Sequence, residues 1–275
     1  MLRQRVITAL ILGLLLLAAM FWLPSAEWAV LVLLVVALGA HEWGRLAKLA
    51  GGGLALYVAT ATAGLGGIIG YGAVHGGHFA ELQFAVYGLA AAFWLGVAPF
   101  WLWRGWRPRR MVLALVGGVV LIPAGLAMNE LRAASPATLL FYLLLVWLAD
   151  TSAYFAGKRF GKRKLAPSIS PGKTWEGAAG AILGVTLYVL LVGWLSLHLP
   201  AAGRYVEVVA MAWVLVAISI EGDLFESAVK RQAGVKDSGA LLPGHGGMLD
   251  RIDALTSALP LAGLAVLAEK FSGGA

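Results

Sequence analysis

Long apolar stretches recur along this chain, and they constrain its fold more than any other feature. A transmembrane helix needs about 20 mainly apolar residues. Stretches that approach this length lie at residues 6–24, 27–44, 54–74, 81–103, 111–129, 137–156, 175–199, 205–224 and 253–271. The sequence therefore predicts an all-α, polytopic membrane protein with about nine transmembrane helices.

The composition excludes several other classes of protein. Hydrophobic residues make up 60% of the 275 residues and charged residues only 13%, whereas a soluble domain carries about 25% charged residues. The chain has no cysteine, which excludes disulfides, thiolate metal sites and cysteine nucleophiles. The first apolar stretch follows Arg3 and Arg5, as a signal peptide would. It is longer than a signal core of about 7–15 residues, so we expect a retained span.

Basic residues predict the orientation of these spans. With the N-terminus on the cytoplasmic side, all but three of the 21 lysines and arginines fall on that side, the exceptions being Arg132, Arg204 and Lys270. Lysine and arginine concentrate in cytoplasmic loops of membrane proteins. We therefore expect a protein of the cell inner membrane with a cytoplasmic N-terminus and an outside C-terminus. The net charge of +7 then reflects topology, and no nucleic-acid partner is expected.

The acidic residues divide the chain in two. No aspartate precedes Asp150, so we expect residues 1–135 to form an N-terminal transmembrane scaffold. Residues 136–275 would form a C-terminal transmembrane catalytic half of the same membrane domain. Carboxylates at a membrane edge are costly and therefore indicate function. Asp150 shares a helix face with Tyr154, which is consistent with a functional role. An ion pair with Lys158 or Arg159 near the helix end would also explain why an acid occurs here.

A basic loop leads to Gly172-Lys173-Thr174, which superficially resembles a P-loop. That motif needs a glycine where this chain has Pro167. Instead we expect Thr174 to cap the helix that follows, with Glu176 in its first turn. Free N–H groups at a helix start, together with Lys173, would bind a phosphate or polyphosphate.

A second polar segment begins where the eighth apolar stretch ends. If the helix continues, Asp223, Ser227 and Lys230 lie on one stripe at i, i+4 and i+7. Glu226 and Lys230 would form a surface ion pair worth a few tenths of a kcal/mol.

The loop after this helix is rich in glycine and acids. Glycines around His245 would let the backbone approach a ligand closely. Asp250 and Asp253 are three residues apart and can share a helix face. Carboxylates without cysteine suit Mg²⁺, which binds through one or two carboxylates together with substrate phosphates.

Many polar positions of this segment form one long pattern. They are Ser227, Lys230, Arg231, Lys236, Asp237, Gly239, Pro243, His245, Gly246, Gly247, Asp250, Arg251 and Asp253. The pattern resembles the signature of phosphatidate cytidylyltransferases, also called CDP-diacylglycerol synthases. The segment 170–177 and the helix end at Asp150 resemble the same family, so the resemblance covers roughly the C-terminal half.

The resemblance implies a nucleotidyltransferase of phospholipid biosynthesis. CTP and phosphatidate would give CDP-diacylglycerol and pyrophosphate, with Mg²⁺ as cofactor. A second metal, a monovalent cation and a homodimer are left open. The expected catalytic residues are Asp223, Asp250, Lys230, Arg231, His245 and Arg251. The expected substrate-binding residues are Lys173, Thr174, Glu176, Ser227, Lys236, Asp237 and Asp150, and the expected metal ligands are Asp223, Asp250 and Asp253.

Three alternatives remain open on the sequence. A cytidylyltransferase for another lipid phosphate, such as an isoprenoid ether lipid, would carry the same signature. A cation transporter would use membrane-edge aspartates, but it predicts acids at mid-span. A lipid-binding scaffold has no need for paired acids.

Overall fold

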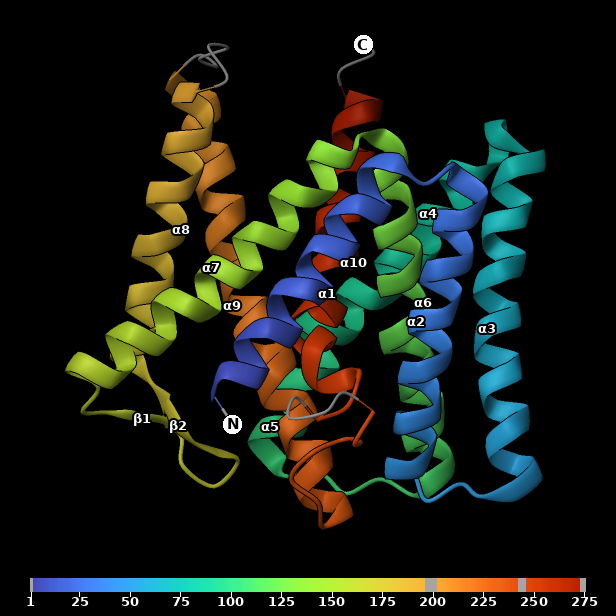
Figure 1. The fold of residues 1–275 in the computed structure, drawn as a ribbon, viewed down its shortest axis with the longest axis horizontal. Helices are drawn as coiled ribbons and strands as arrows, with labels where there is room; N and C mark the ends of the chain where they lie inside the picture. Colours follow the sequence, from blue (N-terminus) through green and yellow to red (C-terminus); the bar gives the residue numbers. More distant parts are fainter. Residues whose placement is uncertain (1, 196–201, 242–245, 273–275) are drawn as a thin grey trace.

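The computed structural model describes residues 2–195, 202–241 and 246–272, and nearly all of them are helical. Figure 1 shows long helices standing roughly side by side, with α7 crossing them obliquely. The elements in chain order are α1 (Leu2–Trp22), α2 (Ser25–Leu46), α3 (Gly51–Val74), α4 (Gly76–Ala92), a π-helical turn (Phe93–Val97), α5 (Ala98–Arg104), α6 (Arg110–Ala134), α7 (Pro136–Phe160), β1 (Lys164–Ala166), β2 (Ser170–Thr174), α8 (Trp175–Leu195), α9 (Ala202–Ala233) and α10 (Leu249–Ser272).

The predicted class of fold is confirmed. Within the described residues, eight helices are long and apolar enough to cross a membrane. The shorter apolar stretch Leu10–Trp22 of α1 adds a ninth candidate. A bilayer interior cannot hydrogen-bond to free backbone groups, so a chain this apolar satisfies them within helices.

Several helices differ from the predicted spans. The stretch 81–103 is interrupted by the π-helical turn, and Pro99 stands at the start of α5. Helix α9 continues to Ala233, and α10 begins four residues earlier than its apolar core, at Leu249. Apolar patterning ends where polar residues begin, but these helices extend into the polar segments because their polar side chains find buried partners.

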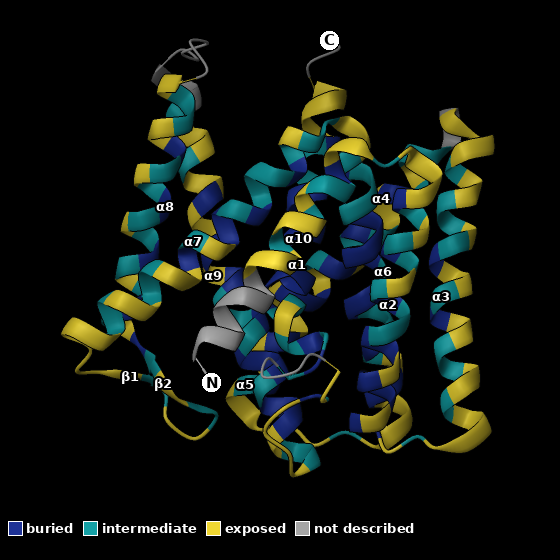
Figure 2. Cartoon of the chain, viewed as in Figure 1, coloured by how far each residue is buried: buried dark blue, intermediate teal, exposed yellow. Residues whose placement is uncertain are grey.

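The core lies around α6 and α10. In the most apolar window of each helix, 61% of the residues are buried in α10, compared with 11% in α3. Figure 2 shows the same contrast: dark, buried residues concentrate in the middle of the bundle, and α3 and α8 are largely yellow and teal. The outer helices therefore present their apolar side chains to lipid.

A short antiparallel hairpin joins α7 to α8, with Lys164 opposite Thr174 and Ala166 opposite Ser170. It lies at the lower left of Figure 1, below the ends of both helices. Helix α8 packs closely on α7 at Gly180 and Gly184. A side chain at either position would collide with α7, at Ala156 or Ser152 respectively.

The two chain ends point to opposite ends of the bundle. Helix α1 begins near the end that carries the hairpin, and α10 finishes at the other end (Figure 1). This arrangement suits an odd number of crossings.

Candidate active site

A cavity of about 660 Å³ lies where the hairpin meets α7, α8, α9 and α10. The structure brings together six of the predicted site residues in its wall, from three separate parts of the sequence. They are Asp150, Lys173, Thr174, Asp223, Asp250 and Asp253. The acids of the second polar segment and the cation of the first thus face one space.

Thr174 caps α8 as predicted. Its buried Oγ1 accepts the Gly177 N–H at 3.1 Å. Glu176 does not line the cavity; its exposed carboxylate accepts the N–H groups of Lys162 and Arg163, at 3.0 and 3.2 Å. Glu176 therefore anchors the loop before the hairpin, and this loop holds the hairpin against α8.

Lys173 and Asp223 form the central ion pair of the cavity. The Lys173 Nζ lies 2.6 Å from Asp223 Oδ2 and donates to the Ile220 carbonyl at 3.2 Å. The Ser227 hydroxyl donates to Asp223 Oδ1 at 3.3 Å, as the predicted helical stripe requires. The two charged side chains are 22% and 30% exposed, so a ligand in the cavity can reach them.

Lys230 forms a second ion-pair network, which is deeply buried. Its Nζ lies 2.6 Å from Asp250 Oδ1 and 3.1 Å from Glu226 Oε2. The expected surface pair of Glu226 and Lys230 is wrong, since these residues are only 3% and 7% exposed. Removing one partner from a buried pair leaves an uncompensated charge, so this network is structurally important.

The other oxygen of Asp250 organises the loop before α10. Asp250 Oδ2 accepts the Gly247 N–H at 2.8 Å, and the Ser238 N–H and Oγ–H at 3.0 Å each. Gly246 has φ +81°, a conformation that favours glycine, and a side chain there would press on Asp250. Both Asp250 oxygens therefore already have donors.

Glu42, on α2 in the N-terminal half, is a site residue that the sequence reasoning missed. It is 5% exposed, and its carboxylate accepts the N–H groups of Met248 and Leu249 at 2.9 and 2.8 Å. The Ser238 hydroxyl also lies 2.9 Å from Glu42 Oε2. Glu42 thus satisfies the free N–H groups at the start of α10, where a negative charge is favoured.

Glycines make room for the Glu42 carboxylate. A side chain at Gly239 or Gly247 would collide with it. This close approach, together with the turn at Gly246, explains the glycines around the loop better than conformational freedom alone.

Four other predicted residues lie outside the cavity wall. Arg231, Lys236, Asp237 and Arg251 are exposed, and Arg231 Nη1 donates to the Val235 carbonyl at 3.1 Å. His245 lies outside the described residues.

Further cations and aromatic groups from α7 and β1 reach the cavity. Lys158, Lys164 and Tyr154 line it, and the Lys158 Nζ sits 5.7 Å from the centre of the Tyr154 ring. Among the ion pairs of the described residues, none joins Asp150 to Lys158 or Arg159. Neither Lys158 nor Lys164 was among the expected site residues.

The donor set suits a hard divalent cation. No three acidic or histidine side chains within the described residues are grouped closely enough to hold a metal by themselves. Mg²⁺ nevertheless takes one or two carboxylates and completes its shell with water and substrate phosphates. Asp223 and Asp253 line the same cavity, and a cation bound there would relieve repulsion between their carboxylates.

Lysines and carboxylates that share one cavity are the groups that phosphate chemistry uses, as in a nucleotidyltransferase. The comparisons with known proteins agree. The model of the cytidylyltransferase family matches residues 3–268, so the chain belongs to this family, and it is a multi-pass membrane protein.

Named relatives extend the likeness over both halves of the chain. It is 41% identical to a phosphatidate cytidylyltransferase of Pseudomonas aeruginosa over 272 residues, 95% of each chain. It is 34% identical to the Haemophilus influenzae protein of that name, over 94% of this chain and 96% of the relative. A Brucella abortus protein with the same name is 46% identical over 141 residues, half of this chain. The resemblance to phosphatidate cytidylyltransferases expected from the C-terminal half is thus confirmed.

Proposed function

We propose that this protein transfers the cytidylyl group of CTP to phosphatidate, forming CDP-diacylglycerol and pyrophosphate. The names of its relatives support this substrate pair. The single observation that carries the proposal is the cavity in which Lys173 and Asp223 pair beside Asp150 and Asp253. It offers both cations for phosphates and carboxylates for a metal.

The chemistry would be an in-line displacement. An oxygen of the lipid phosphate attacks the α-phosphorus of CTP, the bond to the β-phosphate oxygen breaks, and pyrophosphate leaves with the electron pair. The nucleophile is already anionic, so the site needs no strong base. The difficulty is repulsion between anions, which positioned cations relieve.

The lysines of the cavity would meet this need. Lys173 is held by Asp223 at 2.6 Å, which fixes its ammonium near the triphosphate. Lys158 and Lys164 line the same cavity and would hold the second anion. Lys230, whose ammonium is shared by Glu226 and Asp250, would position the acids rather than touch substrate.

We propose Mg²⁺ as the cofactor, held by Asp223 and Asp253, with Asp250 alongside. When bound, it would neutralise charge on the triphosphate and the leaving pyrophosphate. Asp250 and Asp223 already have donors on both oxygens. Asp250 would ligate only if Lys230 moved. Asp223 would share its oxygens with Lys173 and the Ser227 hydroxyl. Arg231, Lys236, Asp237, Arg251 and His245 stay predictions as substrate contacts, as do a homodimer, a second metal and a monovalent cation.

The cavity would open at the cytoplasmic face of the cell inner membrane, because CTP is a solute and the basic loops favour that side. Large aromatic side chains beside it are well exposed: Phe155 at 64%, Phe160 at 62% and Trp175 at 60%. Aromatic residues gather at the membrane interface. The lipid substrate would enter sideways, past this aromatic rim.

A substrate comparison tests the proposal. Purified protein in vesicles receives labelled CTP and Mg²⁺ with either phosphatidate or an isoprenoid ether lipid phosphate. We expect product from phosphatidate, and we expect a Lys173→Gln variant to lose most of this activity. Product from the ether lipid alone would mean that the lipid substrate is the ether lipid and not phosphatidate. Ion flux without CTP turnover would favour a transporter.

A further inference from the structure

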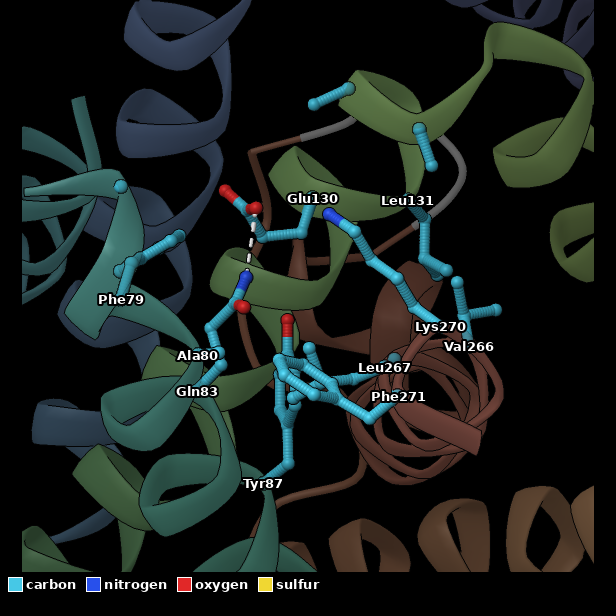
Figure 3. Close-up of a pocket in the computed structure, with 14 residues that line it drawn as sticks. Phe79, Ala80, Gln83, Tyr87, Glu130, Leu131, Val266, Leu267, Lys270 and Phe271 are labelled. Carbon is cyan, nitrogen blue, oxygen red and sulfur yellow. Dashed lines mark hydrogen bonds between the residues drawn. The ribbon is translucent and has the colours of Figure 1, made fainter. Parts of the chain in front are cut away.

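A second cavity, of about 320 Å³, lies at the other end of α10. Its walls come from the start of α4 and the ends of α6 and α10, and Figure 3 shows their side chains converging. Lys270 follows Asp250 by roughly 20 residues on α10, or about 30 Å, the thickness of a bilayer core. The proposed reaction therefore uses none of these residues, and the cavity faces the opposite leaflet.

An oriented carboxylate forms one side of this cavity. Glu130 Oε2 accepts the Gln83 Nε2–H at 2.8 Å, and Oε1 accepts the Asn129 Nδ2–H at 3.0 Å. Gln83 is 8% exposed and comes from another helix, so the carboxylate is fixed by tertiary contacts. Each Glu130 oxygen keeps a lone pair for a ligand.

Tyr87 supplies a buried group without a partner. Its side chain is 1% exposed, and its hydroxyl has no hydrogen-bond partner among the residues that the structure describes. Gly263 lets the ring approach α10, since a side chain there would lie 2.9 Å from the ring. Figure 3 shows the hydroxyl pointing toward the side where Glu130 and Lys270 lie. Leaving such a group unsatisfied is unfavourable, and a ligand that accepts its hydrogen bond would recover this cost.

A cation and apolar walls complete the cavity. Lys270 is exposed at the rim and its ammonium points toward Glu130 (Figure 3). The ion pairs among the described residues do not include Lys270 with Glu130, although both residues line the cavity. Phe79, Leu267 and Phe271 form the apolar wall.

We infer that this cavity binds the zwitterionic head group of a phospholipid that carries a primary ammonium, on the leaflet opposite the active site. The ammonium would pair with Glu130, the phosphate with Lys270 and the Tyr87 hydroxyl, and the glyceride with the apolar wall. A simple anion would be repelled by Glu130. A metal ion is a poorer fit, because Glu130 is the one acid among the described residues that line the cavity.

Lipid retention by the full-length protein tests this inference. Native mass spectrometry would follow dioleoylphosphatidylethanolamine, dioleoylphosphatidylglycerol and free O-phosphoethanolamine. Glu130→Gln should lower retention of the ethanolamine lipid about tenfold and leave the glycerol lipid unchanged, because only the former has an ammonium. Lys270→Gln should lower retention of both about threefold, as an exposed cation does. Free O-phosphoethanolamine should bind weakly, since it lacks the apolar part.

Two further variants keep the result interpretable. Glu81→Gln removes an exposed carboxylate from the same end of α4, outside the cavity, and should retain lipid like the unmodified protein. Tyr87→Phe should keep the melting temperature in lipid-free detergent, yet lower retention of the ethanolamine lipid about fivefold. Equal retention by Glu130→Gln and Glu81→Gln, or equal loss of both lipids in Glu130→Gln, would overturn the inference. CTP turnover in detergent should not change in these variants, so failure here would leave the proposed reaction intact.

Discussion

The carboxylate of Glu42 on α2 accepts the N–H of Leu249 at the start of α10, with 2.8 Å between the oxygen and the nitrogen. The same carboxylate holds Ser238, which also donates to Asp250. A residue of the N-terminal half thereby fixes the loop that presents the acids of the cavity. The expected division into a scaffold and a catalytic half assigned no such task to residues 1–135.

Replacing Glu42 should therefore affect both stability and activity. Glu42→Ala leaves two N–H groups and the Ser238 hydroxyl with one acceptor fewer, and should lower the free energy of unfolding by about 3 kcal/mol. CTP turnover should fall with it. Thermal unfolding in detergent and a labelled-CTP assay measure the two effects. Glu27→Ala, exposed at the other end of α2, is the control, and equal behaviour of the two variants would refute the role of Glu42.

Lys173 should matter for CTP and not for folding. Lys173→Gln removes a partly exposed ammonium and should lower kcat/KM for CTP by about a hundredfold, because a positioned cation stabilises developing phosphate charge. Steady-state kinetics give this ratio. Lys162→Gln, in the exposed loop before the hairpin, should stay within about twofold of the unmodified protein. A Lys173 variant with normal kinetics would contradict the proposed site.

Replacing Lys230 should mainly lower the stability of the protein. Lys230→Met leaves Glu226 and Asp250 buried without their shared cation, and should destabilise the protein by about 3–5 kcal/mol. Adding Glu226→Leu should recover part of this loss, because it removes one of the stranded charges. Melting temperatures of the single and double variants measure this recovery of stability. No recovery in the double variant would mean that the pair is not energetically coupled.

Mg²⁺ should be required for turnover. Chelation with EDTA is expected to abolish product formation, and added Mg²⁺ to restore it. Asp253→Asn should raise the Mg²⁺ concentration for half-maximal rate by about tenfold, whereas Glu207→Gln, exposed near the other end of α9, should not change it. Full activity in EDTA would exclude the cofactor, and an unchanged requirement in Asp253→Asn would exclude this ligand.

The orientation can be tested directly, because the chain has no cysteine to be removed. Lys162→Cys and Ser272→Cys place single thiols at exposed positions near opposite ends of the bundle. In intact cells a membrane-impermeant maleimide should label only the Ser272→Cys variant. Labelling of Lys162→Cys alone would mean that the topology is the reverse of the expected one. Labelling of both variants would mean that an even number of spans lies between the two positions.

Much of the fold was predictable because lipid leaves an apolar chain few alternatives to helices. The cavity was partly predictable, since Asp150, Lys173 and Asp223 stand out as charges next to apolar stretches. The sequence spacing also predicted the Thr174 cap correctly. These are local properties, or they follow from the contrast between polar and apolar segments.

The errors have one physical origin, which is contact between distant segments. Glu226 and Lys230 form a local pair on any helix, and only packing against α10 shows that they are buried. Glu42 stands at the end of a predicted span, and an acid at a membrane edge was a signal that could have been used. Its partners at Met248 and Leu249 could not be read from spacing.

The hydrogen bonds of Glu42 can form only late in the synthesis of the chain. Its acceptor oxygens are made early, but the N–H groups that they bind belong to the last helix of the chain. Until α10 has been synthesised and inserted, that carboxylate stands at the membrane edge without these donors, and the loop that holds Asp250 has no anchor. A chain that stops before α10 therefore lacks both the donors that Glu42 binds and the anchor of the loop that holds Asp250.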